Sequence, residues 1–330
     1  MQKLRWGVLS TAKIGREKVI PALQASQHNE VVAICSRDLQ NARATADSLG
    51  IAQAYGSYED MLADPQIDAI YNPLPNHLHV DWSIKALQAG KHVLCEKPLG
   101  LNTADAQRLI DAARAHPHLK VMEAFMYRFH PQWQLAKKLV DEGAIGKLYA
   151  VHSHFSYNNR EPDNIRNKAE WGGGALLDIG CYSVSLSRWL FNEEPNNVLG
   201  QITPMPGEEV DCLTSGIMEF SAGTASFTAA TKIEPIQYAE AIGDQGSLYI
   251  ERPFYNDSGL PVQKIRITRN RVVEEIEVPD NNHYGAMGDA LALSVFNNTP
   301  VPTPLEDAIA NMRCIDAIFQ SAAERRWVRI

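Results

Sequence analysis

The chain has 330 residues, of which 45% are hydrophobic and 21% charged, and its formal net charge at pH 7 is −8. This length is about twice that of a usual domain, so it predicts two domains with enough core to need no disulfide or metal. The composition is that of a globular protein and excludes disordered, collagenous and coiled-coil chains. The acidic balance argues against nucleic acid or a membrane surface as a partner.

The start of the chain and the cysteines indicate the compartment. Residues 1–10 run at once into the short apolar segment 6–9, without the longer apolar stretch and cleavage site of a secretory signal. No apolar run approaches the ~20 residues that cross a bilayer. The five cysteines are scattered and form no Cys-x-x-Cys pair, which is typical of reduced thiols. We therefore expect a cytoplasmic protein.

Residues 1–122 alternate short apolar runs with amphipathic helical stretches. The apolar runs lie at 6–9, 31–35, 69–72, 92–95 and 120–122. The helical stretches lie at 15–26, 39–49, 78–89 and 102–115. Apolar strands separated by helices imply right-handed crossovers, so we predict an α/β domain with a doubly wound parallel sheet.

From residue 123 to residue 330 the pattern changes to consecutive strands with polar alternation. The strand-like segments lie at 148–155, 217–220, 224–228, 264–268 and 272–278. The helical stretches lie at 131–141, 174–191, 283–297 and 305–323. Such alternation is typical of an antiparallel sheet with one solvated face. We predict an α+β domain with a large, mostly antiparallel open sheet for substrate binding and oligomerisation, whose helix at 305–323 is able to pack back on the first domain.

The turn after the first strand stands where a Rossmann domain has its dinucleotide motif, Gly-x-Gly-x-x-Gly. The six residues in that place are Ser10, Thr11, Ala12, Lys13, Ile14 and Gly15. Although serine and alanine replace the first two glycines, small residues still let backbone amides approach a pyrophosphate at a helix N-terminus. The alternative interpretation is an ordinary strand–helix turn.

The end of the second strand indicates which dinucleotide binds. An NAD-binding domain usually has an acid here for the ribose 2′-hydroxyl, whereas this strand ends in Ser36 and Arg37, and Asp38 comes two residues late. A hydroxyl and a guanidinium suit a 2′-phosphate, because arginine offers a planar fork of donors. The pair therefore favours NADP over NAD. The alternative is that Arg37 only caps a solvated loop.

Two unusual segments follow the strands predicted at 69–72 and 92–95. Residues 73–79 form the proline-stiffened loop Pro-Leu-Pro-Asn-His-Leu-His, and Glu96-Lys97-Pro98 follows the later strand. Ligands of open α/β sheets bind beyond the carboxyl ends of the strands. A lysine there loses solvation, and nearby charges can tune its pKa for chemistry. The alternative is a surface ion pair followed by a proline that delays the next helix.

A polar stripe runs along the apolar helix predicted at 174–191. Its members, at positions i, i+3, i+4 and i+7 of one helix face, are Asp178, Cys181, Tyr182 and Ser185. Buried polar groups must be paired. The stripe therefore either bonds structurally to the neighbouring domain or faces a cleft as catalytic groups against Lys97.

Three of these motifs carry a resemblance. Ser-x-Ala-x-x-Gly at 10–15, Glu-Lys-Pro at 96–98 and Gly-Gly-Gly…Asp-x-Gly-x-Tyr at 172–182 resemble the glucose–fructose oxidoreductase/inositol dehydrogenase/rhizopine catabolism (Gfo/Idh/MocA) family, over essentially the whole chain. Tyr182, where many members have histidine, and the segment 123–131 are similar to one branch. That branch holds glucose–fructose oxidoreductase, dimeric dihydrodiol dehydrogenases and NADP-dependent aldose (xylose) dehydrogenases. The two lost glycines depart from the pattern and leave the affinity for coenzyme open.

The resemblance implies an active site at the seam of the two domains, with Lys97, Asp178 and Tyr182 around the nicotinamide. Hydride transfer from a carbinol carbon requires removal of the hydroxyl proton. Tyr182 would take that proton, Lys97 would stabilise the phenolate, and Asp178 would orient the pair. The resemblance also implies a cis peptide bond between Lys97 and Pro98.

The ligand contacts follow from the same motifs, with Asn76 and His79 expected to border the nicotinamide. The expected cofactor-binding residues are Ser10, Thr11, Ala12, Lys13, Ile14, Ser36, Arg37, Leu74, Pro75, Asn76, His79, Glu96 and Lys97. The expected substrate contacts are Tyr127, Arg128, Arg166 and Tyr182.

The predicted function is NADP-dependent hydride transfer between the nicotinamide and a carbinol carbon of a sugar, as in an aldose 1-dehydrogenase of the xylose or glucose type or the reverse reductase. One alternative is a trans-dihydrodiol dehydrogenase, whose aromatic substrate would need an apolar pocket. A non-catalytic regulator that senses NADP or a sugar is an alternative of another class. The presence of Lys97, Asp178 and Tyr182 favours an enzyme.

The sequence also allows predictions about metal binding and oligomerisation. Three His-x-His pairs occur, at 77/79, 116/118 and 152/154, but no nearby cysteine or acid completes a zinc site, so we predict no metal. The alternating strands between 213 and 278 leave one sheet face available, which predicts a homodimer joined sheet to sheet, as the resemblance also implies.

Overall fold

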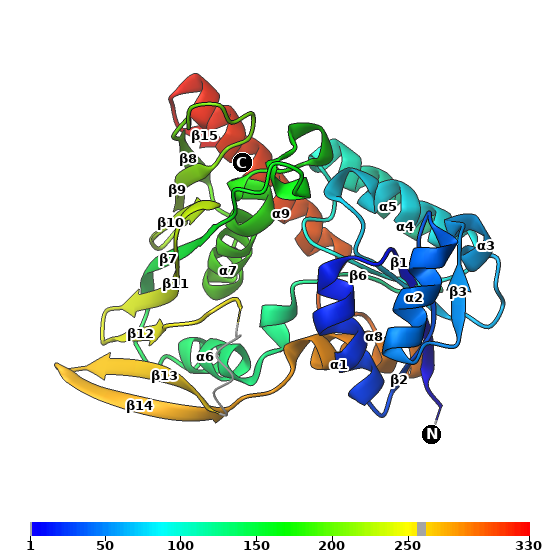
Figure 1. Ribbon diagram of the computed structural model, residues 1–330. Coiled ribbons are helices and arrows are strands. Elements are labelled where there is room, and N and C mark those ends of the chain that lie inside the picture. Colours follow the sequence, from blue (N-terminus) through cyan, green and yellow to red (C-terminus); the bar gives the residue numbers. More distant parts are fainter. Residues whose placement is uncertain (1, 256–261) are drawn as a thin grey trace. The chain divides into compact units, whose positions relative to one another are not determined.

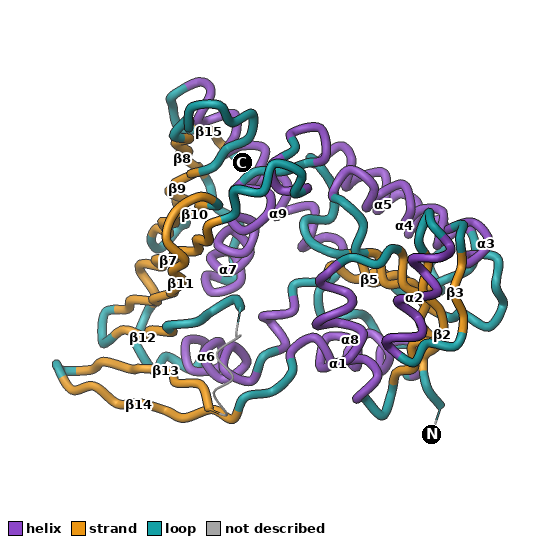
Figure 2. The backbone as a smooth tube through the Cα atoms, viewed as in Figure 1, coloured by secondary structure: helices purple, strands orange, loops and turns teal. Residues whose placement is uncertain are grey.

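The computed structural model describes residues 2–255 and 262–330. The chain forms two compact units, which are best followed in Figures 1 and 2. Unit 1 comprises Met1–Met126 and Asn282–Ile309, and unit 2 comprises Tyr127–Asn281 and Ala310–Ile330. Each unit has its own sheet.

The sheet of unit 1 has six parallel strands within the described residues, in the order β3-β2-β1-β4-β5-β6. The strands are β1 (Leu4–Leu9), β2 (Asn29–Cys35), β3 (Gln53–Tyr55), β4 (Ala69–Asn72), β5 (His92–Cys95) and β6 (Val121–Glu123). This order confirms the predicted doubly wound parallel sheet. The order reverses between β1 and β4, and in such sheets ligands bind beyond the carboxyl ends of the strands at that reversal.

Helices connect the strands of unit 1. They are α1 (Ile20–Ala25, preceded by a π-helical turn at Gly15–Val19), α2 (Leu39–Leu49), α3 (Tyr58–Leu62), α4 (His79–Gln88), α5 (Thr103–Ala115) and α8 (His283–Phe296). Side-chain caps fix several starts: Asn102 accepts from the backbone N–H of Asp105 at the start of α5. The sequence pattern missed only the short elements here, β3 and α3, because three and five residues are too few to show a period.

Helix α8 comes late in the chain but belongs to unit 1, where it contacts α1. Its Asp289 accepts a hydrogen bond from the side chain of Asn29 at 2.7 Å, and Asn29 in turn accepts from the indole N–H of Trp6 at 2.8 Å. Trp6 and Asn29 are fully buried. This chain of bonds joins β1, β2 and α8 and satisfies polar groups that would be costly to bury unpaired.

The sheet of unit 2 has nine strands in the part of the chain that the structure describes, in the order β14-β13-β12-β11-β7-β10-β9-β8-β15. The strands are β7 (Leu148–Asn158), β8 (Asn197–Ile202), β9 (Leu213–Glu219), β10 (Thr224–Ala230), β11 (Lys232–Gly243), β12 (Ser247–Ile250), β13 (Val262–Arg269), β14 (Val272–Pro279) and β15 (Val328–Arg329). Strands β7 and β10 run parallel, and the other recorded pairs are antiparallel. The prediction of a large, mostly antiparallel sheet is confirmed.

Three helices accompany this sheet. They are α6 (Pro131–Asp141), α7 (Cys181–Phe191, preceded by a π-helical turn at Leu176–Gly180) and α9 (Leu305–Glu324), whose residues from 310 onward belong to unit 2. Helix α7 is buried over most of its length. Helix α9 approaches β8 so closely that a Cβ at Gly200 would lie 2.4 Å from the carbonyl oxygen of Ile318. Among the described residues, no helix is long and apolar enough to cross a membrane.

Candidate functional site

The turn after β1 has a serine in the position of the first glycine of the dinucleotide motif. Ser10 has φ +78°, in the left-handed region that favours glycine. Its hydroxyl accepts a hydrogen bond from the backbone N–H of Ala12 at 3.3 Å. The residues that follow, Lys13 and Ile14, enter the π-helical turn at Gly15. Ser10 thus has the positive φ that favours glycine, although it is a serine.

The segment after β2 lies beside that turn. Asn41 of α2 donates to the hydroxyl of Thr11 at 3.1 Å, which joins the two segments. Asp38 caps α2, because its carboxylate accepts from the backbone N–H of Gln40 at 2.9 Å. The capping explains why the acid comes two residues late. Ser36 and Arg37 precede the cap, and Arg37 is exposed.

The loop between β4 and α4 is fastened by His79. This ring is buried, with Nδ1 2.8 Å from the carbonyl oxygen of Pro98 and Nε2 2.7 Å from that of Leu74. Burial lowers the pKa of the His79 imidazole to about 4, although two carbonyl neighbours favour protonation. Asn72 supports the same loop through the backbone N–H of Leu74, which donates to its side-chain oxygen. Pro75 and Asn76 belong to this loop, and their contacts with a cofactor stay a prediction, as does that of His79.

The turn that carries Lys97 is braced on several sides within unit 1. The Lys97–Pro98 peptide bond is cis, which confirms the prediction. Glu96 accepts from the hydroxyl of Tyr71 on β4 at 2.8 Å and from the backbone N–H of Lys97 at 3.3 Å. Glu123 at the end of β6 accepts from the backbone N–H of Leu99 at 2.8 Å. These bonds hold the backbone on both sides of Lys97 at the carboxyl edge of the sheet.

In unit 2, the glycines before the buried helix are required by close contacts. Gly172 and Gly174 have φ +75° and +112°. A Cβ at Gly174 would lie 2.0 Å from Oδ1 of Asp211, and one at Gly173 would lie 2.5 Å from the carbonyl oxygen of Arg166. The run therefore lets the preceding loop at Arg166 and the distant segment at Asp211 approach the start of the helix.

Asp211 fixes that helix start. Its carboxylate accepts from the backbone N–H of Leu176 at 2.7 Å and from the hydroxyl of Thr214 at 2.6 Å. Its carbonyl oxygen accepts from the backbone N–H of Ala175 at 2.6 Å. Burial raises the pKa of the Asp211 carboxyl to about 6, and the nearby charge of Asp178 adds to this.

Asp178 lies in the π-helical turn and is bound by two donors. The hydroxyl of Tyr157 on β7 donates to Oδ2 at 2.5 Å, and Nε of Arg166 donates to the same oxygen at 3.0 Å. Asp178 is buried, whereas 40% of the Arg166 side chain is exposed. The negative charge of Asp178 raises the pKa of Arg166. Arg166, predicted as a substrate contact, is thus held next to a predicted catalytic group.

Tyr182 lies one turn beyond Asp178 in a cluster of aromatic rings. Its ring centroid is 5.8 Å from those of Tyr127 and Phe155 and 5.4 Å from that of Phe254. Tyr182 is 5% exposed. The phenol predicted to act as the base is therefore set in an apolar wall.

The other members of the polar stripe, and two predicted substrate contacts, are bonded inside unit 2. Cys181 donates to the carbonyl oxygen of Asp178 at 3.6 Å. The hydroxyl of Ser185 is 2.8 Å from that of Tyr127 and accepts from Arg128 at 2.8 Å. Tyr127 and Arg128 are buried. Their role as substrate contacts stays a prediction.

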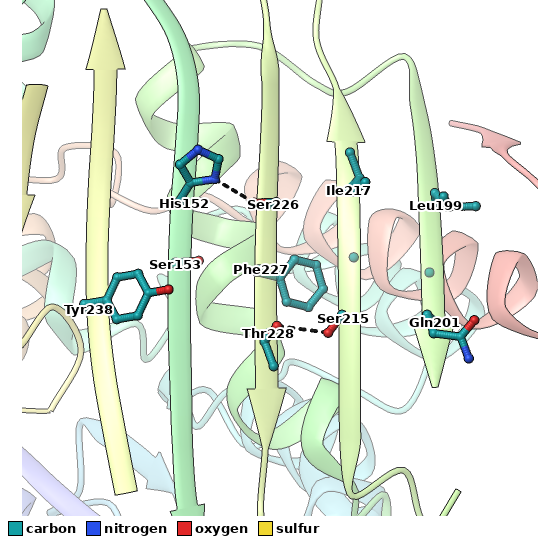
Figure 3. Close-up of a pocket in the computed structure, with 12 residues that line it drawn as sticks. His152, Ser153, Leu199, Gln201, Ser215, Ile217, Ser226, Phe227, Thr228 and Tyr238 are labelled. Atoms are coloured by element: carbon teal, nitrogen blue, oxygen red, sulfur yellow. Dashed lines mark hydrogen bonds between the residues drawn. The ribbon is translucent and has the colours of Figure 1, made fainter. Parts of the chain in front are cut away.

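A hollow of about 350 Å³ lies on the opposite face of the nine-stranded sheet. Figure 3 shows the hydrogen bonds that line it, between His152 and Ser226 and between Ser215 and Thr228. Side chains alternate along a strand, so His152 points away from the face that carries Tyr157. In residues 2–255 and 262–330, no group of three or more His, Cys, Asp or Glu side chains could hold a metal ion.

Comparison with known proteins decides the family. Residues 4–125 match the profile of an oxidoreductase family with an NAD-binding Rossmann fold, named GFO/IDH/MocA, and residues 133–249 match the C-terminal domain of the same family. The chain is 39% identical over 97% of its length, and over 97% of the relative, to D-xylose 1-dehydrogenase (NADP(+)) 2 of Haloferax volcanii. The chain belongs to the GFO/IDH/MocA oxidoreductase family.

Two further members of the GFO/IDH/MocA family show its range. Trans-1,2-dihydrobenzene-1,2-diol dehydrogenase of Xenopus tropicalis is 36% identical over 78% of each chain. KijD10, a 3-ketoreductase from Actinomadura kijaniata solved in complex with NADP and TDP-benzene, is 30% identical, covers 97% of this chain and 98% of its own, and superimposes with a TM-score of 0.90. The chain is an enzyme of this oxidoreductase family, confirming that prediction.

Sequence analysis missed Tyr157 and Asp211. Neither residue lies in a recognisable motif, and both reach the helix from distant segments: Asp211 is 35 residues from the backbone N–H that it binds. The available signal for Asp211 was the glycine run itself, since adjacent glycines indicate that another segment approaches closely. Nothing in the sequence indicates the bond between Tyr157 and Asp178.

Proposed function

We propose that this protein is an NADP-dependent oxidoreductase that transfers a hydride between the nicotinamide and a carbinol carbon of a sugar, in the manner of an aldose 1-dehydrogenase. One observation carries the proposal. Lys97, Asp178 and Tyr182 are all present in a chain that is 39% identical, over nearly its full length, to an NADP-dependent xylose dehydrogenase. A sensor that had left catalysis would have no need of all three groups.

The residues around the first turn of unit 1 fit NADP. Ser10 has the positive φ that favours glycine in the position of the motif's first glycine, and the exposed Arg37 offers donors suited to a 2′-phosphate. Asp38 is engaged in capping α2, which leaves no acid of this segment to bind a ribose 2′-hydroxyl. The remaining proposed contacts are Thr11, Ala12, Lys13, Ile14, Ser36, Leu74, Pro75, Asn76, His79, Glu96 and Lys97.

In the proposed mechanism, bound NADP supplies or accepts the hydride. Tyr182 holds and takes up the hydroxyl proton, a step that its ordinary pKa near ~10 makes difficult without a cation. Lys97 is the proposed cation, and Asp178 orients these groups. The partly exposed guanidinium of Arg166 is the proposed hydrogen-bond donor to the sugar.

A trans-dihydrodiol dehydrogenase is the second candidate, and the aromatic rings beside Tyr182 favour it. Phe155, Phe254 and Tyr127 all lie within 6 Å of its ring, between centroids. An apolar wall suits a flat ring substrate as well as the C–H face of a sugar. The aldose assignment is preferred because Arg166, which bonds to Asp178 one helical turn before Tyr182, offers a polar contact for a sugar.

A substrate panel tests both candidates. Initial rates of NADP⁺ and NAD⁺ reduction are measured at mildly alkaline pH with aldoses, polyols and trans-dihydrodiols. We expect turnover of an aldose with NADP⁺. Turnover only of dihydrodiols would select the second candidate, and no change in coenzyme absorbance with any compound would revive the sensor.

The Lys97→Met variant tests the catalytic assignment. We expect turnover to fall by about two orders of magnitude or more, because the cation that favours the phenolate is removed. NADP binding, followed by NADPH fluorescence, should persist. Lys120→Met is the matched control, since Lys120 is a partly exposed lysine of unit 1 whose side chain donates to that of Asn298. Near-normal turnover of Lys97→Met would contradict the assignment.

We also propose that the protein is a cytoplasmic homodimer joined through the open face of the unit 2 sheet. All five cysteines are buried and free, which suits a reducing compartment. Ile217 and Ile236 are 38% and 50% exposed, and their register with His152 and Ser156 places both on the open face. We propose that these side chains, together with the open face between them, form the interface.

A further inference from the structure

Tyr157 of β7 bonds directly to the carboxylate of Asp178. Phe155 and Tyr157 share a face of β7, and the Phe155 ring packs against Tyr182. The Tyr157 hydroxyl lies 2.5 Å from Oδ2 of Asp178, which is the length of a strong, charge-assisted hydrogen bond. Strand β7 therefore delivers a donor to the carboxylate from outside the helix.

Arg166 delivers a second donor to the same oxygen, at 3.0 Å. Its backbone is fixed, because its carbonyl oxygen accepts from the N–H of Gly174 at 2.9 Å and its N–H donates to Asn164 at 3.1 Å. The segment that carries Arg166 is thus tied to the glycine run immediately before Asp178. Both donors come from backbone that other bonds hold in place.

The charges around Asp178 favour its ionised form. The charged and titratable groups of unit 2 that interact with it include Tyr157, Arg166 and Asp211, and Tyr182 follows one helical turn later. Burial, together with the charge of Asp178, raises the pKa of Tyr157, so that this phenol stays protonated and donates. Asp211 carries a competing negative charge only above its pKa of about 6. Hydrogen bonds to a carboxylate favour the charged form.

We propose that Tyr157 is a positioning residue of the reaction: with Arg166 it holds the carboxylate of Asp178 ionised and in a fixed orientation one helical turn from Tyr182. The inference rests on the proposed function, because it takes Asp178 to serve hydride transfer. The competing account is structural only, with Tyr157 tying β7 to the helix and no effect on chemistry.

The bond itself is tested without any assay of activity. A double-mutant cycle combines Tyr157→Phe and Asp178→Asn and follows unfolding by denaturant. We expect a coupling of about tenfold in the unfolding equilibrium constant at pH 7, the size usual for a hydrogen bond to a charged group. The coupling should persist at pH 4, near the ordinary pKa of an aspartate, and fade only at lower pH, because the two donors favour the charged carboxylate. Additive effects at pH 7 would overturn the inference.

The role in the reaction is tested by kinetics of Tyr157→Phe. We expect kcat to fall about tenfold, KM for NADP⁺ to stay within about twofold, and the acid limb of the pH–rate profile to move up by about one pH unit, since the carboxylate loses a donor. Tyr55→Phe is the matched control, because it removes another tyrosine–aspartate bond, 2.7 Å from Asp64 in unit 1.

The outcomes separate this inference from the proposed function. A wild-type pH profile and kcat in Tyr157→Phe, with lowered stability alone, would leave only the structural account and overturn the positioning role. A wild-type enzyme that turns over no compound of the panel would overturn the proposed function. In that case the cycle and its pH dependence decide whether Tyr157 is coupled to the ionised form of Asp178.

Discussion

Ser10 shows how a single residue can replace a glycine while the backbone keeps its conformation. An L-residue in the left-handed region costs roughly 1 kcal/mol, because its Cβ crowds the following carbonyl oxygen. Ser10 adopts φ +78° nonetheless and recovers part of the cost by accepting from the N–H of Ala12. The turn after β1 is therefore strained at its first residue, within the proposed cofactor site.

The variant Ser10→Gly should be more stable than the wild type. We expect the free energy of unfolding to rise by roughly 1 kcal/mol, because glycine adopts the left-handed region without strain. Denaturant unfolding provides the measurement. Ser48→Gly is the control, since Ser48 lies inside helix α2, where glycine lowers stability by roughly 0.5–1 kcal/mol. A destabilised Ser10→Gly would show that the serine hydroxyl matters more than the strain.

At the scale of elements, the three residues that connect β2 to α2 have two different functions. Asp38 caps α2 and stabilises the helix, whereas Ser36 and Arg37 carry the proposed recognition of the 2′-phosphate. A cap of this kind contributes about 1 kcal/mol to stability. The two functions can therefore be changed independently.

The variant Ser36→Asp should shift the coenzyme preference toward NAD. We expect the ratio of kcat/KM for NADP⁺ to that for NAD⁺ to fall about tenfold or more, because a carboxylate repels the 2′-phosphate and accepts from a ribose hydroxyl. Steady-state kinetics with both coenzymes provide the measurement. In the control Asp38→Ala, stability should drop by about 1 kcal/mol with the ratio unchanged. An unchanged ratio in Ser36→Asp would remove Ser36 from the ribose site.

The start of the buried helix in unit 2 depends on Asp211, and its raised pKa gives a stability signature. The unfolded chain deprotonates this group near pH ~4 and the folded chain near pH 6. Between these values the folded state binds more protons, so stability falls as pH rises from about 4 to 6 and is level above. The shift corresponds to about 2–3 kcal/mol.

The variant Asp211→Asn should remove this component. We expect its free energy of unfolding to change less between pH 4 and pH 6 than that of the wild type, by about 2–3 kcal/mol, because the amide does not titrate. Asp163→Asn serves as the control, since Asp163 is fully exposed. Identical pH profiles for Asp211→Asn and the wild type would show that the folded state does not raise this pKa.

At the scale of the whole molecule, the proposed dimer places the open sheet face between two copies of the chain. The variant Ile217→Lys should dissociate it, because two-fold symmetry puts each introduced charge into the same interface. Light scattering after size-exclusion measures the mass. Val272→Lys is the control, as Val272 is 69% exposed at the edge strand β14. A monomeric wild type, or a dimeric Ile217→Lys, would contradict the proposal.

The sequence pattern predicted elements with a regular hydrophobic period and missed elements in which that period is interrupted or too short to see. The predicted β4, β5, α2 and α6 have the observed bounds, because each has a clear period and strong end signals. Strand β11 was missed, although it has 12 residues, because Pro235 interrupts it and the register shifts between Lys232 and Ile236. Strands β12 and β15 were missed because four and two residues are too few to show a period, and β8 was missed as well.

Chemistry-bearing residues within motifs were predictable, whereas their partners were not. Lys97 and Asp178 could be named because their neighbours in sequence form recognisable patterns. Tyr157 and Asp211 act through bonds to residues far along the chain, and one sequence carries no record of which distant segments meet. For the same reason, the sequence could not predict that Tyr127 and Arg128 both bond to Ser185 inside unit 2.

The division of the chain has a consequence for modularity. The chain passes from one unit to the other after residues 126, 281 and 309, so unit 1 is not a continuous stretch of sequence. A gene fragment ending at residue 126 would encode all six strands of its sheet but not α8, and it would leave Asn29 without Asp289 and Leu23 without its neighbour Gly288. The nucleotide-binding unit can therefore be transplanted or exchanged between enzymes only together with the returning segment 282–309.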